Sequence, residues 1–143
     1  MMNRSLFLIF MFTSCMGATQ DLSSHRWENR LLLILVEDTD HPVYQDQISE
    51  LNRDIAGVED RRLIIYTIKQ NEFATGLKKS AWIPSDDLYT NYKQLDGEFE
   101  IILIGLDGGI KLRQAELLKT DKLFAFIDAM PMRRNELRKR EDK

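Results

Sequence analysis

The chain has 143 residues, and its 20 Lys and Arg against 23 Asp and Glu give a formal net charge of −3. Charged residues make up 30% of it and apolar residues 43%, which is typical of one soluble globular domain and excludes a collagen or a disordered tail. A single Cys excludes an internal disulfide framework. The mild acidity argues against a nucleic-acid binder, since such a protein normally carries a basic face.

The first 18 residues are predicted to be a signal peptide. Arg4 is the only charged side chain before Asp21, and an apolar run covers residues 6–12. A basic start, a short apolar stretch and a small-residue exit are typical of a secretory signal. The run is too short to cross a bilayer, which takes about 20 residues. A buried first strand or helix is the weaker alternative, because no turn signal or polar alternation adjoins the run.

The end of this signal allows two interpretations. Residues 15–17 place small side chains suitably for a cut before Ala18, whereas residues 12–15 loosely resemble a bacterial lipobox in which Cys15 would be acylated. Phe12 stands where a lipobox usually has Leu. Both interpretations predict an exported protein, periplasmic or membrane-anchored in a bacterium, whose single domain over residues 19–143 contains no Cys.

The domain is predicted to start with a strand–helix–strand unit. The apolar runs at 30–36 and 63–68 are typical of strands buried on both faces. Asp40 is a candidate helix cap, Pro42 suits the first helical turn, and Gly57 predicts the helix end. One apolar stripe at helical spacing connects these signals: Tyr44, Ile48, Leu51 and Ile55. The crossover of such a βαβ unit is right-handed.

The middle of the chain is less regular. Residues 69–84 lack a clear period, so we interpret them as a surface loop held by Trp82, although a connection of this length is often functional. Ser85 is predicted to cap the next helix. The inner stripe of that helix would be Leu88, Tyr92 and Leu95.

The last third predicts a hairpin followed by helices. A third apolar strand covers 99–105, Asp107-Gly108-Gly109 is a turn signal, and 110–113 alternates as an edge strand does. Thr120 or Asp121 begins a helix, and Pro131 ends it or begins another. Its inner positions are Leu123, Phe124, Ile127 and Met130. Residues 133–143 are charged and predicted to be solvated.

This order of elements predicts an α/β fold that is thioredoxin-like, with a four-stranded mixed sheet in the order 2-1-3-4 and helices on both faces. Residues 25–34, 103–113 and 123–136 add to the topology, above all the Ile-Asp-x-Met-Pro-Met-Arg-Arg sequence in the last stretch. Together they resemble a thioredoxin-like domain of unknown function, found in small exported bacterial proteins and at the C-terminus of vertebrate sushi-repeat-containing and related matrix proteins. The resemblance implies this fold over nearly the whole mature chain, and it implies no settled activity.

Thiol chemistry is predicted to be absent. In active thioredoxin-like oxidoreductases the nucleophilic Cys follows the first strand, where the helix N-terminus favours the thiolate. Residues 37–42 here are Glu-Asp-Thr-Asp-His-Pro, and the Thr39 hydroxyl is a poor nucleophile without an activating base. Asp-Gly-Glu at 96–98 also stands where thioredoxins have a cis-Pro before the third strand. We therefore expect neither disulfide exchange nor Cys-based peroxidase activity.

Two clusters are candidate sites. Glu37, Asp38, Asp40 and His41 offer oxygen and imidazole ligands for a metal after the first strand, but their spacing fits no established motif, so a solvated acidic loop is the preferred interpretation.

The second cluster surrounds Met130-Pro131-Met132. Asp128, Arg133 and Arg134 flank it, as a partner or anion site or, preferably, as an ion pair at the helix junction. The basic run 138–140 is interrupted by acidic neighbours, so a solvated helix end is preferred over an anion-binding surface.

The first functional hypothesis is a Cys-free module that binds an unknown protein or small ligand in the cell envelope. The alternative is a non-thiol oxidoreductase or metal-dependent enzyme using the Glu37–His41 loop, and a third is a structural lipoprotein tethered through Cys15. We assign no catalytic, cofactor-binding or metal-binding residue and expect no cofactor, no nucleic-acid partner and no transmembrane span.

Overall fold

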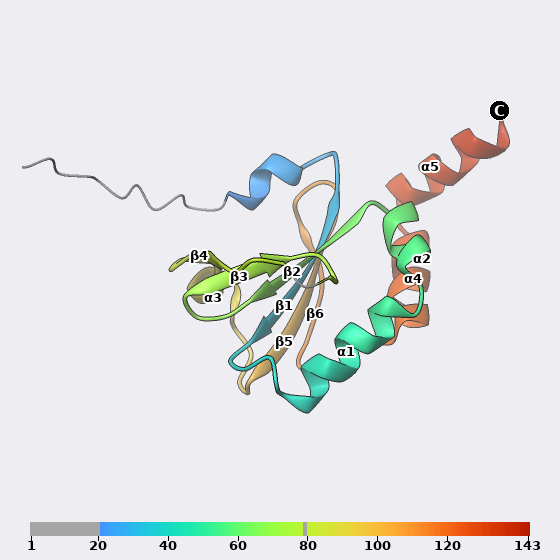
Figure 1. Cartoon of the computed structure of the whole chain (residues 1–143). Helices are drawn as coiled ribbons and strands as arrows, with labels where there is room; N and C mark the ends of the chain where they lie inside the picture. Colours follow the sequence, from blue (N-terminus) through green and yellow to red (C-terminus); the bar gives the residue numbers. More distant parts are fainter. Residues whose placement is uncertain (1–20, 79) are drawn as a thin grey trace, which may run out of the picture.

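The structure is a computed structural model that describes residues 21–78 and 80–143. The predicted signal peptide and Cys15 lie outside the described residues. A six-stranded mixed sheet forms the centre of the molecule, with strand order β4-β3-β2-β1-β5-β6 (Figure 1). In chain order the strands are β1 (Arg30–Val36), β2 (Leu63–Ile68), β3 (Glu72–Thr75), β4 (Ile83–Pro84), β5 (Phe99–Ile104) and β6 (Ile110–Gln114).

The three central strands form where the sequence predicts them. Every residue of β1 is buried, and β1 pairs in parallel with β2 and antiparallel with β5. Leu33 lies opposite both Tyr66 and Ile102 in this register. A strand with a neighbour on each side and packed elements over both faces has to be continuously apolar, as β1 is from Leu31 onwards. The predicted order 2-1-3-4 is confirmed as the run β2-β1-β5-β6.

The prediction for residues 69–84 was wrong in one respect, because this stretch contains two more strands. β3 pairs antiparallel with β2 through contacts such as Thr67 opposite Ala74, and β4 pairs with β3. Strands of four and two residues are too short to show a period of two. β3 joins the sheet by pairing with β2 and β4 by pairing with β3, so the sheet has six strands rather than four while the fold class is unchanged.

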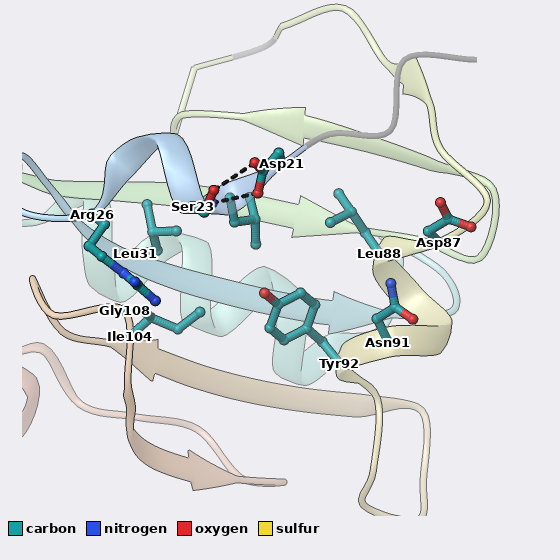
Figure 2. A pocket seen from close by; sticks show the side chains of 11 residues that line it. Asp21, Ser23, Arg26, Leu31, Asp87, Leu88, Asn91, Tyr92, Ile104 and Gly108 are labelled. Atoms are coloured by element: carbon teal, nitrogen blue, oxygen red, sulfur yellow. Dashed lines mark hydrogen bonds between the residues drawn. The ribbon is translucent and has the colours of Figure 1, made fainter. Parts of the chain in front are cut away.

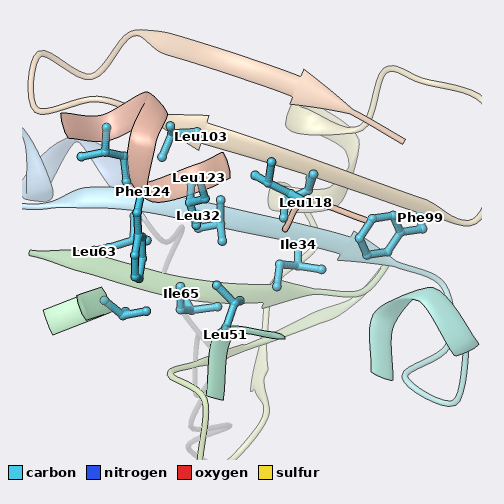
Figure 3. Packing of buried hydrophobic residues seen from close by; sticks show 13 residues of the cluster. Leu32, Ile34, Leu51, Leu63, Ile65, Phe99, Leu103, Leu118, Leu123 and Phe124 are labelled. Carbon is cyan, nitrogen blue, oxygen red and sulfur yellow. The ribbon is translucent and has the colours of Figure 1, made fainter. Parts of the chain in front are cut away.

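Helices cover both faces of the sheet. Helices α1 (Pro42–Asn52), α2 (Ile55–Asp60) and α4 (Thr120–Asp128) pack on the face that includes Leu32 and Ile34 (Figure 3). The short η1 (Leu22–His25) and α3 (Leu88–Tyr92) pack on the opposite face, which includes Leu31 and Leu33. Successive side chains of a strand point to opposite faces, so β1 supplies both cores in alternation.

The predicted single helix, which was to have Pro42 in its first turn and to end at Gly57, is two helices. α1 ends at Asn52, and α2 begins after Asp54, whose Oδ1 accepts a hydrogen bond from the Gly57 N–H at 2.8 Å. Gly57 therefore lies inside α2 and ends nothing. The residue before α1 is His41 rather than the predicted Asp40, although Pro42 does occupy the first turn.

Two other boundaries differ from prediction. Ser85 does not cap α3, which follows Asp87, and Leu95 lies beyond its end. α4 starts at Thr120 and α5 (Pro131–Glu141) at Pro131, as predicted. The expectation that 133–143 is solvated fails at Arg133, which is 1% exposed because carboxylates from three elements surround it. None of the helices in the described ranges is long and apolar enough to cross a membrane.

Candidate functional site

The corner where thioredoxin-like enzymes hold their thiol is a tight polar turn here. Residues 37–41 lead from the carboxyl end of β1 into α1. Asp38 Oδ1 accepts a hydrogen bond from the Asp40 N–H at 3.0 Å, and its carbonyl accepts one from the His41 N–H at 3.1 Å. The Asp38 side chain therefore stabilises the turn, as Asp side chains commonly do at such positions.

The four candidate metal ligands do not converge. His41 Nε2 lies 3.4 Å from Glu98 Oε2, a partner from the loop before β5 that the sequence analysis did not include. Across residues 21–78 and 80–143, no three side chains of His, Cys, Asp or Glu are grouped so that they could hold a metal ion. The metal hypothesis thus has no ligand set in this part of the chain.

A cavity of about 450 Å³ opens beside this corner. Thr39 lines it together with Tyr44 of α1, Thr67 of β2 and Trp82. The hydroxyls of Tyr44 and Thr67 are 3.1 Å apart, and Gln45 Nε2 donates to the Thr39 carbonyl at 2.5 Å. These groups can hold a ligand by hydrogen bonds and ring contacts. They include no thiol, and no side-chain base of the described residues is hydrogen-bonded to the Thr39 hydroxyl.

The sulfur atoms of the described residues lie at the other end of β1. Met130 and Met132 line a cavity of about 260 Å³ together with Arg30, the first residue of that strand. A thioether can be oxidised but cannot run a thiol–disulfide cycle. The corner and the methionines therefore do not form one redox site.

The second predicted cluster is a buried ionic network. Asp128 receives hydrogen bonds from Arg133 Nε at 3.1 Å and from Arg61 at 3.0 and 2.6 Å. Arg133 also pairs with Asp60. The ion-pair interpretation of Asp128 is confirmed for Arg133, whereas Arg134 is exposed. The sequence pointed to this pair but not to Arg61, which also lies over the Phe124 ring at 3.9 Å.

Glu136 is the centre of the same network and was missed by the sequence analysis. Its carboxylate accepts hydrogen bonds from Arg30, Arg62 and Arg133. Burial acts to raise the pKa of Glu136, but the three guanidinium groups outweigh it and hold the pKa below its ordinary value. Because Arg30 is 1% exposed, this network closes the start of β1 rather than presenting charge to a ligand.

A cleft of about 510 Å³ lies between η1 and α3 (Figure 2). Its floor is apolar, and its rim carries polar side chains that include Asp21 and Tyr92. Burial raises the pKa of the Tyr92 phenol, and the negative charge of Asp21 adds to the effect. Four separate segments build this cleft, so no local sequence pattern could have revealed it.

Comparison with known proteins agrees with this architecture. The model of the family "Domain of unknown function (DUF4174)" matches residues 21–136. The chain belongs to the DUF4174 family. A search of the curated proteins gave no significant match.

Among solved structures, the DUF4174 domain is similar to the reduced form of a 2-Cys peroxiredoxin from Plasmodium vivax. The TM-score is 0.55 and the sequence identity 14%, over 80% of this chain and 83% of the peroxiredoxin chain. Likeness at this identity shows a shared thioredoxin-like fold alone. Residues 21–136, which the family model matches, include the corner, the ionic network and the cleft, so all three belong to the DUF4174 domain itself.

Proposed function

We propose that this DUF4174 protein is an exported binding module of the bacterial cell envelope that performs no thiol chemistry. One observation carries the proposal: the corner between β1 and α1 holds Glu37, Asp38, Thr39, Asp40 and His41 and no sulfur. Carboxylates and an unactivated hydroxyl cannot accept and release a disulfide. Cavities lined by hydrogen-bonding and aromatic groups lie beside this corner and on the other face of the sheet, and such cavities suit binding.

The place of action is part of the same proposal. The basic start and apolar run of residues 1–18 favour export, and Cys15 is the candidate lipid attachment point. The resemblance to small exported bacterial proteins, and to the C-terminal domain of vertebrate sushi-repeat-containing proteins, supports the same location. An envelope binding module needs no cofactor.

The absence of thiol chemistry is tested with the purified protein in insulin-reduction and hydroperoxide-consumption assays, with an intact thioredoxin and peroxiredoxin as positive controls. We expect rates indistinguishable from buffer. Turnover at enzymatic rates would overturn the proposal, because the described residues offer no thiol to sustain it.

Export is tested by intact-mass analysis of the protein from fractions of its native host. We expect an envelope species that has lost the first 17 residues or that starts at an acylated Cys15. If the species is acylated, Cys15→Ser should release it from the membrane fraction. Recovery of the unprocessed 143-residue chain from the cytoplasm would contradict the proposed location.

A further inference from the structure

We propose that the cleft between η1 and α3 binds short peptides that have free termini and apolar side chains. This inference rests on the proposed binding function, and it names the site and the ligand class. The argument combines an apolar floor, two opposite charges that have no partner in the described residues, and a glycine that makes room for one of them.

The floor of the cleft suits apolar side chains. Leu31 of β1 and Ile104 of β5 form its base, and Leu88 of α3 lies to the side (Figure 2). Leu22 of η1 also lines the cleft. All four belong to the core on this face of the sheet. Because these four residues are already only 1–8% exposed, a ligand side chain placed here would gain affinity mainly by removing its own apolar area from water.

The rim carries polar groups that the described part of the domain does not use. The side chains of Arg26, Asp87, Asn91 and the Tyr92 hydroxyl take part in none of its hydrogen bonds or ion pairs. The arginines around Asp128 and Glu136, by contrast, are all engaged with carboxylates. The rim groups are therefore available to a ligand.

The guanidinium of Arg26 lies beside Gly108 in the β5–β6 turn. Gly108 has a φ of +80°, and a Cβ added to it would lie 2.9 Å from Arg26 Nε. Only glycine combines this backbone conformation with the space that the guanidinium occupies. Arg26 thus lies against the turn at one end of the cleft, where its guanidinium can donate to a carboxylate.

The opposite charge is at the other end of the cleft. Asp87 precedes α3 and lies away from Arg26, with Asn91 and Tyr92 on the α3 side between them (Figure 2). A peptide matches this order, because its carboxylate can reach Arg26, its ammonium can reach Asp87, and its amides can bond the Asn91 amide and the Tyr92 hydroxyl. A fatty acid or an alkylamine would satisfy only one of the two charges.

The first experiment titrates the purified full-length protein by calorimetry with trileucine, N-acetyl-trileucine, trileucine amide, octanoate and octylamine. We expect trileucine to bind tightest, and each blocked terminus to weaken binding about tenfold or more, as the loss of a hydrogen bond to a charged group predicts. Equal affinity for free and blocked peptides, or tighter binding of octanoate or octylamine, would overturn the proposal.

The second experiment assigns each terminus to its residue. Arg26→Gln should abolish the preference for trileucine over its amide, and Asp87→Asn the preference for trileucine over its acetylated form. Arg134→Gln and Asp46→Asn, which change the same charges on exposed positions of α5 and α1, should leave both preferences intact. Thermal melts of all four variants are the control for folding.

The results also separate this proposal from the proposed function. If no peptide binds while the thiol assays stay silent, the peptide site is wrong and the thiol-free binding module stands. If the thiol assays show turnover, the proposed function is wrong regardless of the titration. Peptide binding that Arg26→Gln and Asp87→Asn leave unchanged would place the ligand elsewhere and overturn the site.

Discussion

Glu100 is a carboxylate with no solvent exposure in the middle of β5. Its Oε2 accepts hydrogen bonds from the backbone N–H groups of Gln94 and Leu95, both at 2.9 Å, and its Oε1 pairs with Arg113. Burial acts to raise the pKa of Glu100, but these hydrogen bonds outweigh it and lower the pKa. The residue thus fastens the loop that follows α3 to the sheet.

Glu100→Ala is expected to destabilise the domain by roughly 3–5 kcal/mol, because it leaves two backbone donors and Arg113 without their acceptor. Urea denaturation followed by circular dichroism measures the loss. Glu72→Ala is the control, because its pair with Lys69 is partly exposed and is worth at most about 1 kcal/mol. Equal effects of the two variants would show that the Glu100 contacts contribute little.

Gly57→Ala tests close packing at a single helical position. Ala normally stabilises a helix by about 1 kcal/mol relative to Gly. Here a Cβ would lie 2.5 Å from Phe124 Cε2 and 2.6 Å from the capping carboxylate of Asp54, so we expect a net loss of stability from an overpacking cost of roughly 1–3 kcal/mol. Ser49→Ala, at an exposed position of α1, should leave the stability unchanged or raise it. A higher thermal midpoint for Gly57→Ala would contradict the packing.

At the scale of elements, the strands β1, β2 and β5 hold the two cores together. Ile65 contacts the core under α1 and α4, and Ile102 contacts the core under η1 and α3. Their exposures are 2% and 0%. Both side chains are therefore buried, although only one face of the sheet carries the long helices.

Ile65→Asp and Ile102→Asp are each expected to unfold the domain, because either places an unpaired charge in an apolar core. Ile110→Asp is the matched control on edge strand β6, where the side chain is 49% exposed, and it should fold. Thermal melts decide the outcome. A cooperative transition near the wild-type midpoint for either core variant would contradict the strand burial.

At the scale of the whole molecule, charge links the start of β1 to the C-terminal helix α5, whereas α4 packs on the sheet through apolar side chains. The only buried side chain of α5 is Arg133, and its carboxylate partners come from the end of α2, the end of α4 and α5 itself. Ionic contacts therefore position the C-terminal helix.

This arrangement predicts acid lability. The pKa values of Asp60, Asp128 and Glu136 are all lowered in the folded state from ordinary values of 3.8, 3.8 and 4.5. As the pH falls the unfolded chain binds these protons first, so the stability they contribute is complete above the ordinary values and is lost as the pH falls through the folded ones. Urea midpoints should therefore drop from pH 7 to pH 3. Glu136→Ala should be less stable at pH 7 and show a smaller drop.

An unchanged urea midpoint between pH 7 and pH 3 would contradict the network. So would a Glu136→Ala variant with the full wild-type drop, since that carboxylate would then take no part in it. The paired measurement thus separates Glu136 from the other carboxylates of the chain.

The sequence by itself determined the central strands and the missing thiol. A continuous apolar run such as Leu31–Val36 is stable only when the strand is buried on both faces. Residues 37–42 contain no thiol, so they exclude thiol chemistry whatever the conformation of the turn. Pro42 and Pro131 predicted two helix starts because proline lacks the N–H that a first turn leaves unpaired.

Only the tertiary structure decided the rest. β3 is a strand because β2 offers it an edge, β4 is a strand because β3 offers it one, and Gly57 lies so close to the Phe124 ring that a Cβ there would clash with it. Arg30, Arg133 and Glu136 are buried because they meet from distant segments, and the cleft exists because η1 and α3 stand apart on one face. The ionic network and the cleft depend on contacts between residues far apart in the chain, where local propensity and spacing carry no information, and β3 and β4 are too short for their spacing to show a strand.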